Sequence, residues 1–477
     1  MSTFPSDIFA GKRFAVVGLG KNGLPAARGL AAMGAEVLAW DDKESARRAA
    51  ADSGAGVTLR DPASGPFDVD ALVLSPGIPH RLPAPHPAAA GARAAGVPIL
   101  TDVELLYQAV RAAGSRARFA GITGTNGKST TTALLAHILD GTGKPVAAGA
   151  NLGPAALSLP LLPHDGVYVL EMSSYMLERL ATLRFDAAAM LNLSADHLDR
   201  HGDMAGYAMA KRHVFDRQTA ADLAVIGVDD ADSRAMADWL GTRPARVARI
   251  SGFDPTLPLG PALPGTHNAQ NAAAATAMAR FLGAPDEAIA AGLLRFPGLP
   301  HRQQRIVTID GVTFVNDSKA TNADASERAL VCYDRLIWIA GGMAKEGGIE
   351  PLAPLFPRVA KALLIGRDAP QFAETLTRNG VKFDTVGTLD AAVPAAFAAA
   401  KAEGAPVVLL SPACASWDQF TGYDQRGDRF AELARALPAP IVAAQSVSTQ
   451  AVSTQSVSAP VLPAAGPPAG ASPRGGA

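Results

Sequence analysis

The segment with the most evident chemistry covers residues 121–130 and reads GITGTNGKST. Its small residues end in Gly127, Lys128 and Ser129, and an apolar helical pattern follows at once. At such a turn the backbone N–H groups can bind one anion, the lysine can reach phosphate oxygens, and the serine can offer a hydroxyl to Mg²⁺. Ile122 stands where the usual phosphate loop begins with glycine, so the segment predicts a variant loop for a nucleoside triphosphate. The alternative is a flexible turn before a helix.

Acidic and histidine side chains follow two apolar runs further along the chain. Glu171 comes directly after the run 167–170, and NLSADHLDRH, which contains His197, overlaps the run 190–193. The carboxyl ends of parallel strands face the ligand crevice, so Glu171 is placed to reach a metal held by loop phosphates. His197 beside carboxylates predicts mixed oxygen and nitrogen ligands for Mg²⁺ or Mn²⁺, although a single histidine is more often a surface or core residue. Lys211, on the next helical stretch, would by itself be a solvated helix residue.

The N-terminal segment has the pattern of a βαβ unit. Strands are predicted at 13–18 and 36–40, with a helix at 24–33 between them. The turn reads GLGKNG, and Asp41 ends the second strand. Together these features resemble a dinucleotide-binding fingerprint. The alternative is steric, because a tight strand-to-helix turn needs glycine whatever it binds.

Alternating strand and helix patterns predict an α/β protein with parallel sheets covered on both faces. Two segments interrupt the alternation, RAAGSRAR at 111–118 and FPGLPHR at 296–302. After residue 437 the composition is almost entirely Ala, Pro, Ser, Val, Gln and Gly, and it cannot offset its ordering entropy. The predicted parts are domains at 1–112, 113–300 and 301–437 and a disordered tail at 438–477.

The composition is that of an ordinary globular protein. Of 477 residues, 48% are hydrophobic and 18% are charged, and the net charge is −1. No basic cluster favours nucleic acid or an anionic membrane surface, and no segment predicts a signal peptide or a bilayer span. Cys332 and Cys414 form neither a metal pattern nor a disulfide pattern. We therefore expect a cytoplasmic protein without membrane insertion or nucleic-acid binding.

Several motifs stand in the order found in one enzyme family. They are GITGTNGKST, EMSSYMLE, NLSADHLDRH, GTHNAQN, LPHR, VNDSKATN and SPACASWDQF. Over residues 10–437 the chain resembles the Mur ligases, and its last two motifs are most similar to the members that add D-glutamate to UDP-N-acetylmuramoyl-L-alanine. The resemblance implies three domains: a Rossmann-like N-terminal domain for the UDP part of the substrate, a P-loop ATPase-like central domain and a Rossmann-like C-terminal domain.

The same resemblance implies an ATP-dependent ligase of peptidoglycan precursor synthesis that works through an acyl phosphate. The catalytic residues carried over are Lys128, His197 and Lys211, the last as a carbamate. One Mg²⁺ or Mn²⁺ is expected on Ser129 and Glu171, and a second on His197 and the carbamate. ATP contacts are expected from Gly124, Thr125, Asn126, Gly127, Lys128, Ser129, Thr130, Asn268, Asn271, Arg302 and Asp317.

The resemblance also implies two further sites. Glutamate is expected at Lys319, Thr321, Lys345, Ser416 and Tyr423. The UDP part of the substrate is expected at Asn22, Asp41, Ser75, Asn151 and Ser173. Three positions depart from the family pattern. Tyr423 replaces a phenylalanine, Met176 replaces a glutamine, and Gln303-Gln304 stands where an acidic residue is common.

Several alternatives remain open at this stage. The asparagines of GTHNAQN are also suited to capping a helix. The same mechanism would serve L-glutamate or another amino acid, as in other Mur-type or folylpolyglutamate-type ligases. An NAD-dependent oxidoreductase would rest on GLGKNG and Asp41 alone, and a catalytically inactive homologue would not require an intact Lys128. We expect a monomer.

Overall fold

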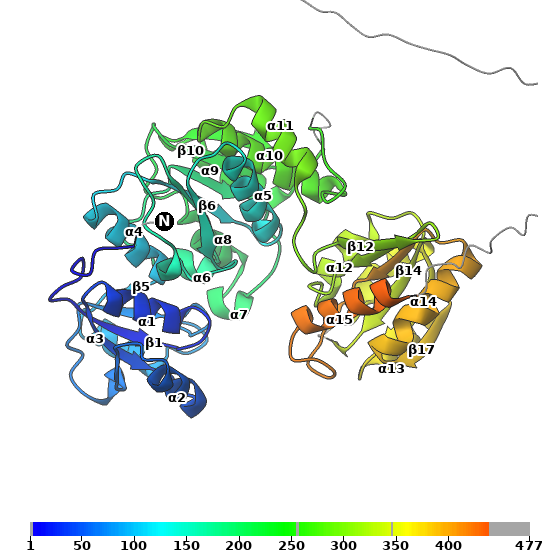
Figure 1. The fold of residues 1–477 in the computed structure, drawn as a ribbon, viewed down its shortest axis with the longest axis horizontal. Helices are drawn as coiled ribbons and strands as arrows, with labels where there is room; N and C mark the ends of the chain where they lie inside the picture. Colours follow the sequence, from blue (N-terminus) through cyan, green and yellow to red (C-terminus); the bar gives the residue numbers. More distant parts are fainter. Residues whose placement is uncertain (1–2, 254–256, 345–346, 438–477) are drawn as a thin grey trace, which may run out of the picture. The chain divides into compact units, whose positions relative to one another are not determined.

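The computed structural model describes residues 3–253, 257–344 and 347–437, whose strands form three large sheets and one short pair (Figure 1). The predicted tail at 438–477 lies outside the described residues. In the first sheet the strand order is β3-β2-β1-β4-β5, and all neighbours are parallel. Its strands are β1 (Arg13–Val17), β2 (Glu36–Trp40), β3 (Thr58–Leu59), β4 (Ala71–Leu74) and β5 (Ile99–Leu100). The helices of this region are α1 (Gly23–Ala32), α2 (Glu44–Asp52), α3 (Pro87–Ala94) and α4 (Asp102–Ala112), with the short 3₁₀ turn η1 (Pro62–Ser64).

The second sheet carries the phosphate loop. Its order is β11-β10-β9-β6-β8-β7, again parallel throughout. Its strands are β6 (Arg118–Thr123), β7 (Val146–Ala150), β8 (Val167–Glu171), β9 (Ala187–Met190), β10 (Leu223–Gly227) and β11 (Arg246–Ile250). The helices are α5 (Lys128–Asp140), α6 (Ser174–Leu177), α7 (Leu198–His201), α8 (Met204–Arg212), α9 (Ala231–Leu240), α10 (Thr266–Phe281) and α11 (Asp286–Arg295), with the 3₁₀ turn η2 (Ala156–Ser158).

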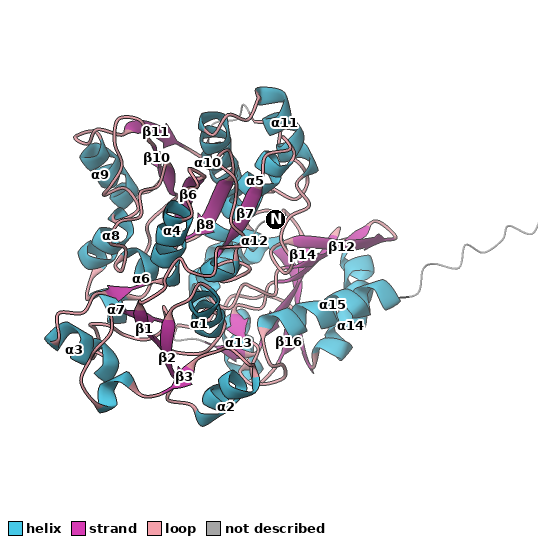
Figure 2. Ribbon diagram, turned by 60° about the vertical axis from the view of Figure 1, so that its left-hand side comes forward, coloured by secondary structure: helices cyan, strands magenta, loops and turns pink. Residues whose placement is uncertain are grey.

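Helices cover both faces of this central sheet, as Figure 2 shows. Successive side chains of a strand point to opposite faces, so β6 contributes to two cores. Ala120 and Ile122 pack in the core that contains residues of α5, α10 and α11, whereas Phe119 packs in the other core, which also contains residues of α4. The prediction of parallel sheets buried on both faces is confirmed here.

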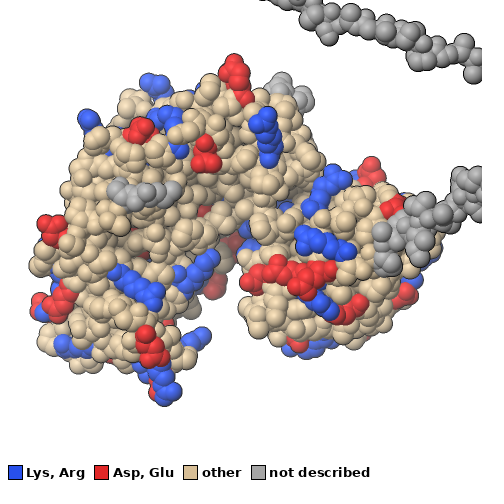
Figure 3. Space-filling model, in the orientation of Figure 1, with Lys and Arg blue, Asp and Glu red and all other residues tan. Residues whose placement is uncertain are grey.

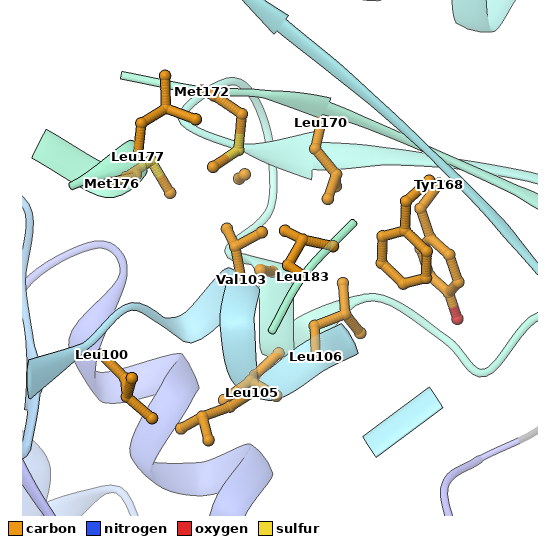
Figure 4. Packing of buried hydrophobic residues seen from close by; sticks show 14 of the residues in the cluster. Leu100, Val103, Leu105, Leu106, Tyr168, Leu170, Met172, Met176, Leu177 and Leu183 are labelled. Atoms are coloured by element: carbon orange, nitrogen blue, oxygen red, sulfur yellow. The ribbon is translucent and has the colours of Figure 1, made fainter. Parts of the chain in front are cut away.

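Helix α4 packs against the central sheet. Figure 4 shows Val103 and Leu106 of α4 close to Leu170 of β8 and to Leu183, and all four side chains are fully or almost fully buried. At about 25 cal/mol per Å² of apolar surface, such a contact stabilises the attachment of α4 to the central strands. The domain boundary near residue 112 stays a prediction.

The third sheet has the order β12-β13-β18-β14-β16-β17. Its strands are β12 (Gln304–Ile309), β13 (Val312–Asn316), β14 (Leu336–Gly341), β16 (Val359–Ile365), β17 (Phe383–Gly387) and β18 (Val407–Leu410), and β15 (Met343–Ala344) pairs separately with β19 (Cys414–Ala415). Its helices are α12 (Ala323–Leu330), α13 (Ala369–Arg378), α14 (Leu389–Glu403) and α15 (Tyr423–Ala436), with the 3₁₀ helix η3 (Glu350–Arg358).

Two predictions about strands were wrong. The third sheet is not wholly parallel, because β12 and β13 form an antiparallel hairpin. The two residues between these strands, Asp310 and Gly311, both have positive φ, as a tight hairpin turn requires. The strand predicted at 190–193 is β9, which ends at Met190, and Asn192 has already left the sheet to bond the phosphate loop.

The described part of the chain shows no membrane span, and charges of both signs lie on the face seen in Figure 3. No helix within it is long and apolar enough to cross a bilayer. On the face seen in Figure 3, basic and acidic side chains lie interspersed among the described residues, and nucleic-acid binding would favour a continuous basic patch.

Candidate active site

The phosphate loop connects the end of β6 to the first turn of α5. Gly124 has φ +147° and Gly127 has φ +83°, conformations that L side chains rarely adopt. A Cβ on Gly127 would lie 2.1 Å from Oδ1 of Asn271, so any other residue here would force the loop or Asn271 to shift. The strand–loop–helix context predicted for a nucleoside triphosphate loop is present.

Asn192 fixes the shape of this loop. Its Oδ1 accepts a hydrogen bond from the backbone N–H of Asn126 at 2.9 Å, and its Nδ2 donates to the carbonyl of Asn126 at 3.2 Å. The side chain of Asn126 donates in turn to Asp324 of α12 at 3.1 Å. The loop is therefore held from two sides, by the segment that follows β9 of the second sheet and by α12, which packs with the third sheet.

Two lysines meet at one carbonyl of the loop. Lys128 Nζ donates to the carbonyls of Gly124, at 2.9 Å, and Thr125, at 2.7 Å, and Lys211 Nζ donates to Gly124 at 2.8 Å. Burial lowers the pKa of Lys128, and it lowers the pKa of Lys211 well below its ordinary value, with the charge of Lys128 as the second cause. Lys211, 1% exposed, is thus no solvated helix residue.

Glu171 offers an oxygen suited to a cation. It ends β8, is 2% exposed, and accepts a hydrogen bond from Asn151 Nδ2 to its Oε1 at 2.5 Å. Its Oε2 is buried and has no hydrogen-bond partner among the described residues. The hydroxyl of Ser129 is also buried and accepts from Arg302 Nη2 at 2.8 Å. A free carboxylate oxygen and a hydroxyl beside a phosphate loop are hard donors of the kind that Mg²⁺ prefers.

His197 lies in a left-handed turn directly before α7, with φ +54°. Its Nε2 is 3.4 Å from Asp196 Oδ2, and its ring packs on Tyr175 with centroids 5.1 Å apart. Burial lowers the pKa of His197, which favours the neutral imidazole that a metal requires. Among the described residues no three His, Cys, Asp or Glu side chains converge on one point, so these groups alone do not complete a metal site.

Three pockets collect most of the predicted residues. The Asn271 pocket is lined by Asn126, Gly127, Thr130, Asn268, Asn271, Arg302 and Asp317 among others. The Lys319 pocket is lined by Thr125 to Ser129, Asn151, Glu171, Arg302, Lys319, Thr321 and Tyr423. The Asp41 pocket is lined by Asn22, Asp41, Ser75 and Asn151. Gly124, Ser173, His197, Lys211 and Ser416 line none of the three, and Lys345 lies outside the described residues.

In the Asn271 pocket, amides and a buried carboxyl group face the phosphate loop. Asn268 Nδ2 donates to the carbonyl of Pro264 at 2.8 Å, and Asn271 Nδ2 donates to Asn268 Oδ1 at 3.1 Å. Helix α10 begins after Gly265 without a side-chain cap, so the capping alternative for the two asparagines is wrong. Burial raises the pKa of Asp317 to about 7, although Ser411 donates to it at 2.8 Å.

In the Lys319 pocket, a cation lies against an aromatic ring. Lys319 Nζ is 3.9 Å from the ring centroid of Tyr423, a cation–π contact that fixes the ammonium group at the pocket wall. Thr321 lines the same pocket, whereas Ser416 is 2% exposed and does not line it. Lysine and hydroxyl groups at a strand end are suited to an anionic substrate.

In the Asp41 pocket, the carboxylate organises the backbone. Asp41 Oδ2 accepts from the N–H of Leu19 at 2.7 Å, and Ser75 Oγ donates to the carbonyl of Gly18 at 2.7 Å. A Cβ on Gly23 would lie 1.7 Å from the oxygen of Gly18. Gly18, with φ +90°, and Gly23 therefore have the steric explanation, whereas Gly20 has no atom near its Cβ position.

Comparisons with known proteins agree with this arrangement. A model of the Mur ligase middle domain matches residues 122–257, and a model of the Mur ligase glutamate ligase domain matches residues 301–414. The chain is 52% identical over 453 residues to UDP-N-acetylmuramoylalanine–D-glutamate ligase of Paramagnetospirillum magneticum, an alignment that covers 90% of this chain and 97% of the relative.

The chain belongs to the Mur ligase family. The enzyme of the same name from Rhodospirillum rubrum is 47% identical over 472 residues, with 92% of this chain and 97% of the relative covered. The crystal structure of UDP-N-acetylmuramate–alanine ligase from Thermotoga maritima shares the fold, with a TM-score of 0.55 at 16% identity, 89% of this chain and 99% of that chain covered. Mur ligases are ATP-dependent amide-bond ligases, which excludes the oxidoreductase alternative.

Some pocket residues of this Mur ligase were not predicted. Lys21 lines both the Asp41 and the Lys319 pocket, and His267 and Arg328 line the Asn271 pocket. Lys21 and His267 lie inside the motifs GLGKNG and GTHNAQN, so their position beside predicted site residues could have indicated them. Arg328 and Asp324, the partner of Asn126, lie on α12 beyond VNDSKATN and carry no pattern of their own.

The departures from the family pattern have structural settings. Met176 is fully buried in the apolar cluster of Figure 4, so its thioether replaces an amide in a setting without water. Gln303 donates its backbone N–H to Asp317 Oδ1 at 3.1 Å and lines the Asn271 pocket. Gln304 accepts from the N–H of His301 at 3.2 Å.

Proposed function

We propose that this Mur ligase joins D-glutamate to UDP-N-acetylmuramoyl-L-alanine at the expense of ATP. One observation carries the proposal: the Lys319 pocket brings the phosphate-loop residues Lys128 and Ser129 together with Asn151, Glu171 and Lys319. A phosphoryl donor, an acceptor carboxylate and an anionic amino acid can thus meet in one place. The relatives that carry this name are similar over nearly their full length.

The reaction has two steps. A carboxylate oxygen of the L-alanyl group attacks the γ-phosphorus of ATP, the bond to the β-phosphate oxygen breaks, and ADP leaves. The amine nitrogen of D-glutamate then attacks the acyl carbon, loses a proton and expels phosphate. Phosphoryl transfer depends mainly on positioning and charge neutralisation, which Lys128, Arg302 and the loop N–H groups can supply.

ATP is assigned to the Asn271 pocket and the phosphate loop. Asn268 and Asn271 face the nucleotide, Arg302 binds phosphate oxygens, and Asp317 accepts a hydrogen bond from a ribose hydroxyl. The other proposed contacts are Gly124, Thr125, Asn126, Gly127, Lys128, Ser129 and Thr130.

Two Mg²⁺ or Mn²⁺ sites are proposed on this chain's donors. Ser129 and the free oxygen of Glu171 would hold one ion, and His197 with a carbamylated Lys211 would hold the other. When bound, the ions neutralise charge on the transferred phosphoryl group. The lowered pKa of Lys211 supports the modification, since only a neutral amine forms a carbamate.

The amino acid and the nucleotide sugar take the remaining pockets. Lys319, Thr321, Lys345, Ser416 and Tyr423 are proposed for the two carboxylates of glutamate. Asn22, Asp41, Ser75, Asn151 and Ser173 are proposed for the UDP part, although Ser173 caps α6 through its side chain. A monomer in the cytoplasm stays our prediction, and the names of the relatives favour D-glutamate over the L-glutamate alternative.

An isotope experiment tests the acyl phosphate. The substrate carboxylate is labelled with ¹⁸O, and the phosphate released in the complete reaction is measured by mass spectrometry. We expect one labelled oxygen in each phosphate, because the attacking oxygen leaves with phosphorus. Unlabelled phosphate, with amide product formed, would refute the mechanism.

A further inference from the structure

Arg179 binds the loop that forms one wall of the Asp41 pocket. This loop, residues 75–78, follows β4, and all its residues line the pocket. Arg179 follows α6 in the central region, and its Nη1 donates to the carbonyls of Leu74, at 2.7 Å, and Ser75, at 3.2 Å. Its Nη2 donates to the carbonyl of Ile78 at 2.8 Å. One side chain thus holds both ends of the loop.

Arg200 binds the middle of the same loop. Its Nη1 donates to the carbonyl of Gly77 at 3.0 Å, and its guanidinium lies 4.4 Å from the ring centroid of Tyr175. Arg200 is on α7, whose N-terminal flank is His197. The loop is therefore tied to the segment that carries a proposed metal ligand.

The hydrogen bonds of Arg179 are buried or partly buried, whereas the bond from Arg200 to Gly77 lies at the surface. Arg179 is 3% exposed, and burial lowers its pKa to about 10, with the charge of Arg200 as the second cause, so it stays protonated near neutral pH. A buried cation must have partners, and the terminal nitrogens of Arg179 donate to the carbonyls of Leu74, Ser75 and Ile78. On the opposite side, Ser75 Oγ donates to Gly18 in the GLGKNG turn.

We propose that Arg179 and Arg200 are positioning residues that hold loop 75–78 in the shape that receives the UDP part of the substrate. The inference rests on the proposed function and deepens it, because it assigns substrate affinity to two residues outside the pocket lining. Loop 75–78 belongs to no strand or helix. Without the two arginines it would lose conformational entropy when the substrate binds, and this loss would weaken binding.

Calorimetric titration of UDP-N-acetylmuramoyl-L-alanine into the full chain without ATP tests the inference. We expect Arg179→Ala to weaken binding by about tenfold to a hundredfold, Arg179→Lys to recover part of the loss, and Arg200→Ala to weaken binding by about tenfold. In turnover, KM for this substrate should rise more than kcat falls. Binding of a non-hydrolysable ATP analogue should be unchanged.

Arg111→Ala is the matched control. Arg111 also donates to two carbonyls, those of Ser115 at 2.9 Å and Ala117 at 3.0 Å, and lies over the ring of Tyr107, but it lines none of the three pockets. Wild-type affinity in both Arg179→Ala and Arg200→Ala would overturn the inference, as would equal losses for substrate and ATP analogue in both. A wild-type chain that fails to bind the nucleotide sugar would instead overturn the proposed function on which the inference rests.

Discussion

A Cβ on Gly127 would lie 2.1 Å from Oδ1 of Asn271, so a side chain at this position of the phosphate loop would clash with the asparagine of α10. Gly127 has φ +83° and lines both the Asn271 pocket and the Lys319 pocket. The proposed ATP site therefore depends on the absence of a side chain at this position.

Gly127→Ala should weaken ATP binding by about a hundredfold, because the loop must shift away from Asn271 before it can bind phosphate. Fluorescence titration with a labelled ATP analogue measures the effect. Gly143→Ala is the control, since Gly143 has a similar φ of +77° but no atom near its Cβ position. Equal affinities for the two variants would contradict the prediction, because Gly143 lines neither the Asn271 pocket nor the Lys319 pocket.

Lys211→Ala should lose about a hundredfold in activity, because the substitution removes the proposed metal ligand from a buried site. Added acetate or formate should restore part of the rate by replacing the carbamate oxygens, as measured by coupled ADP release. Lys144→Ala, changed on a loop outside the pockets, should not respond to these acids. A fully active Lys211→Ala variant would exclude the proposed role.

Glu104→Gln should destabilise the chain at neutral pH by about 2 kcal/mol. The carboxylate of Glu104, on α4, accepts from the N–H groups of Ala181, Thr182 and Leu183 and from the Thr182 hydroxyl. Burial alone would raise its pKa, but these hydrogen bonds, with one from Gln108, outweigh burial and lower it.

The pH dependence of this effect has a definite sign. Because the pKa of Glu104 is lower in the folded chain than its ordinary 4.5, its stabilisation is present above that value and is lost as the pH falls through the folded pKa. Urea midpoints of wild type and Glu104→Gln should therefore converge at acidic pH. The exposed Glu374→Gln variant serves as control. A difference between the urea midpoints of wild type and Glu104→Gln that does not change with pH would contradict the account.

Tyr423→Ala should raise KM for D-glutamate about tenfold, because Lys319 loses the ring that fixes its ammonium group 3.9 Å away. Tyr423→Phe keeps the ring, so its KM should rise much less. Initial rates at saturating ATP and nucleotide sugar give both values. Equal effects of the two substitutions would assign the role to the hydroxyl and not to the ring.

The local parts of the fold were predictable because they follow from short patterns. Strand β2 was predicted at 36–40, where it is found. A short, mainly apolar run between a glycine turn and an aspartate is typical of a buried strand. Strand β9 was misplaced because its first residues are alanines, which carry little strand preference. The hairpin turn at Asp310 and Gly311 was a readable signal that was missed.

Long-range contacts were not predictable from one sequence. Arg179 donates to backbone carbonyls about a hundred residues earlier in the chain. No local sequence pattern predicts that a side chain will bind a distant backbone. Asp324 accepts from Asn126 across a separation of 198 residues, and Asn192 reaches the loop because β9 ends at Met190. The family resemblance supplied the candidate residues, but their packing had to come from the structure.

The most direct test of the central claim is phosphate release by the purified chain with ATP, Mg²⁺ and UDP-N-acetylmuramoyl-L-alanine, in parallel reactions with D-glutamate, L-glutamate and meso-diaminopimelate. The account predicts release that depends on D-glutamate. Release with L-glutamate alone would keep the mechanism and contradict the proposed substrate, and no release with any of the three would contradict the proposed function.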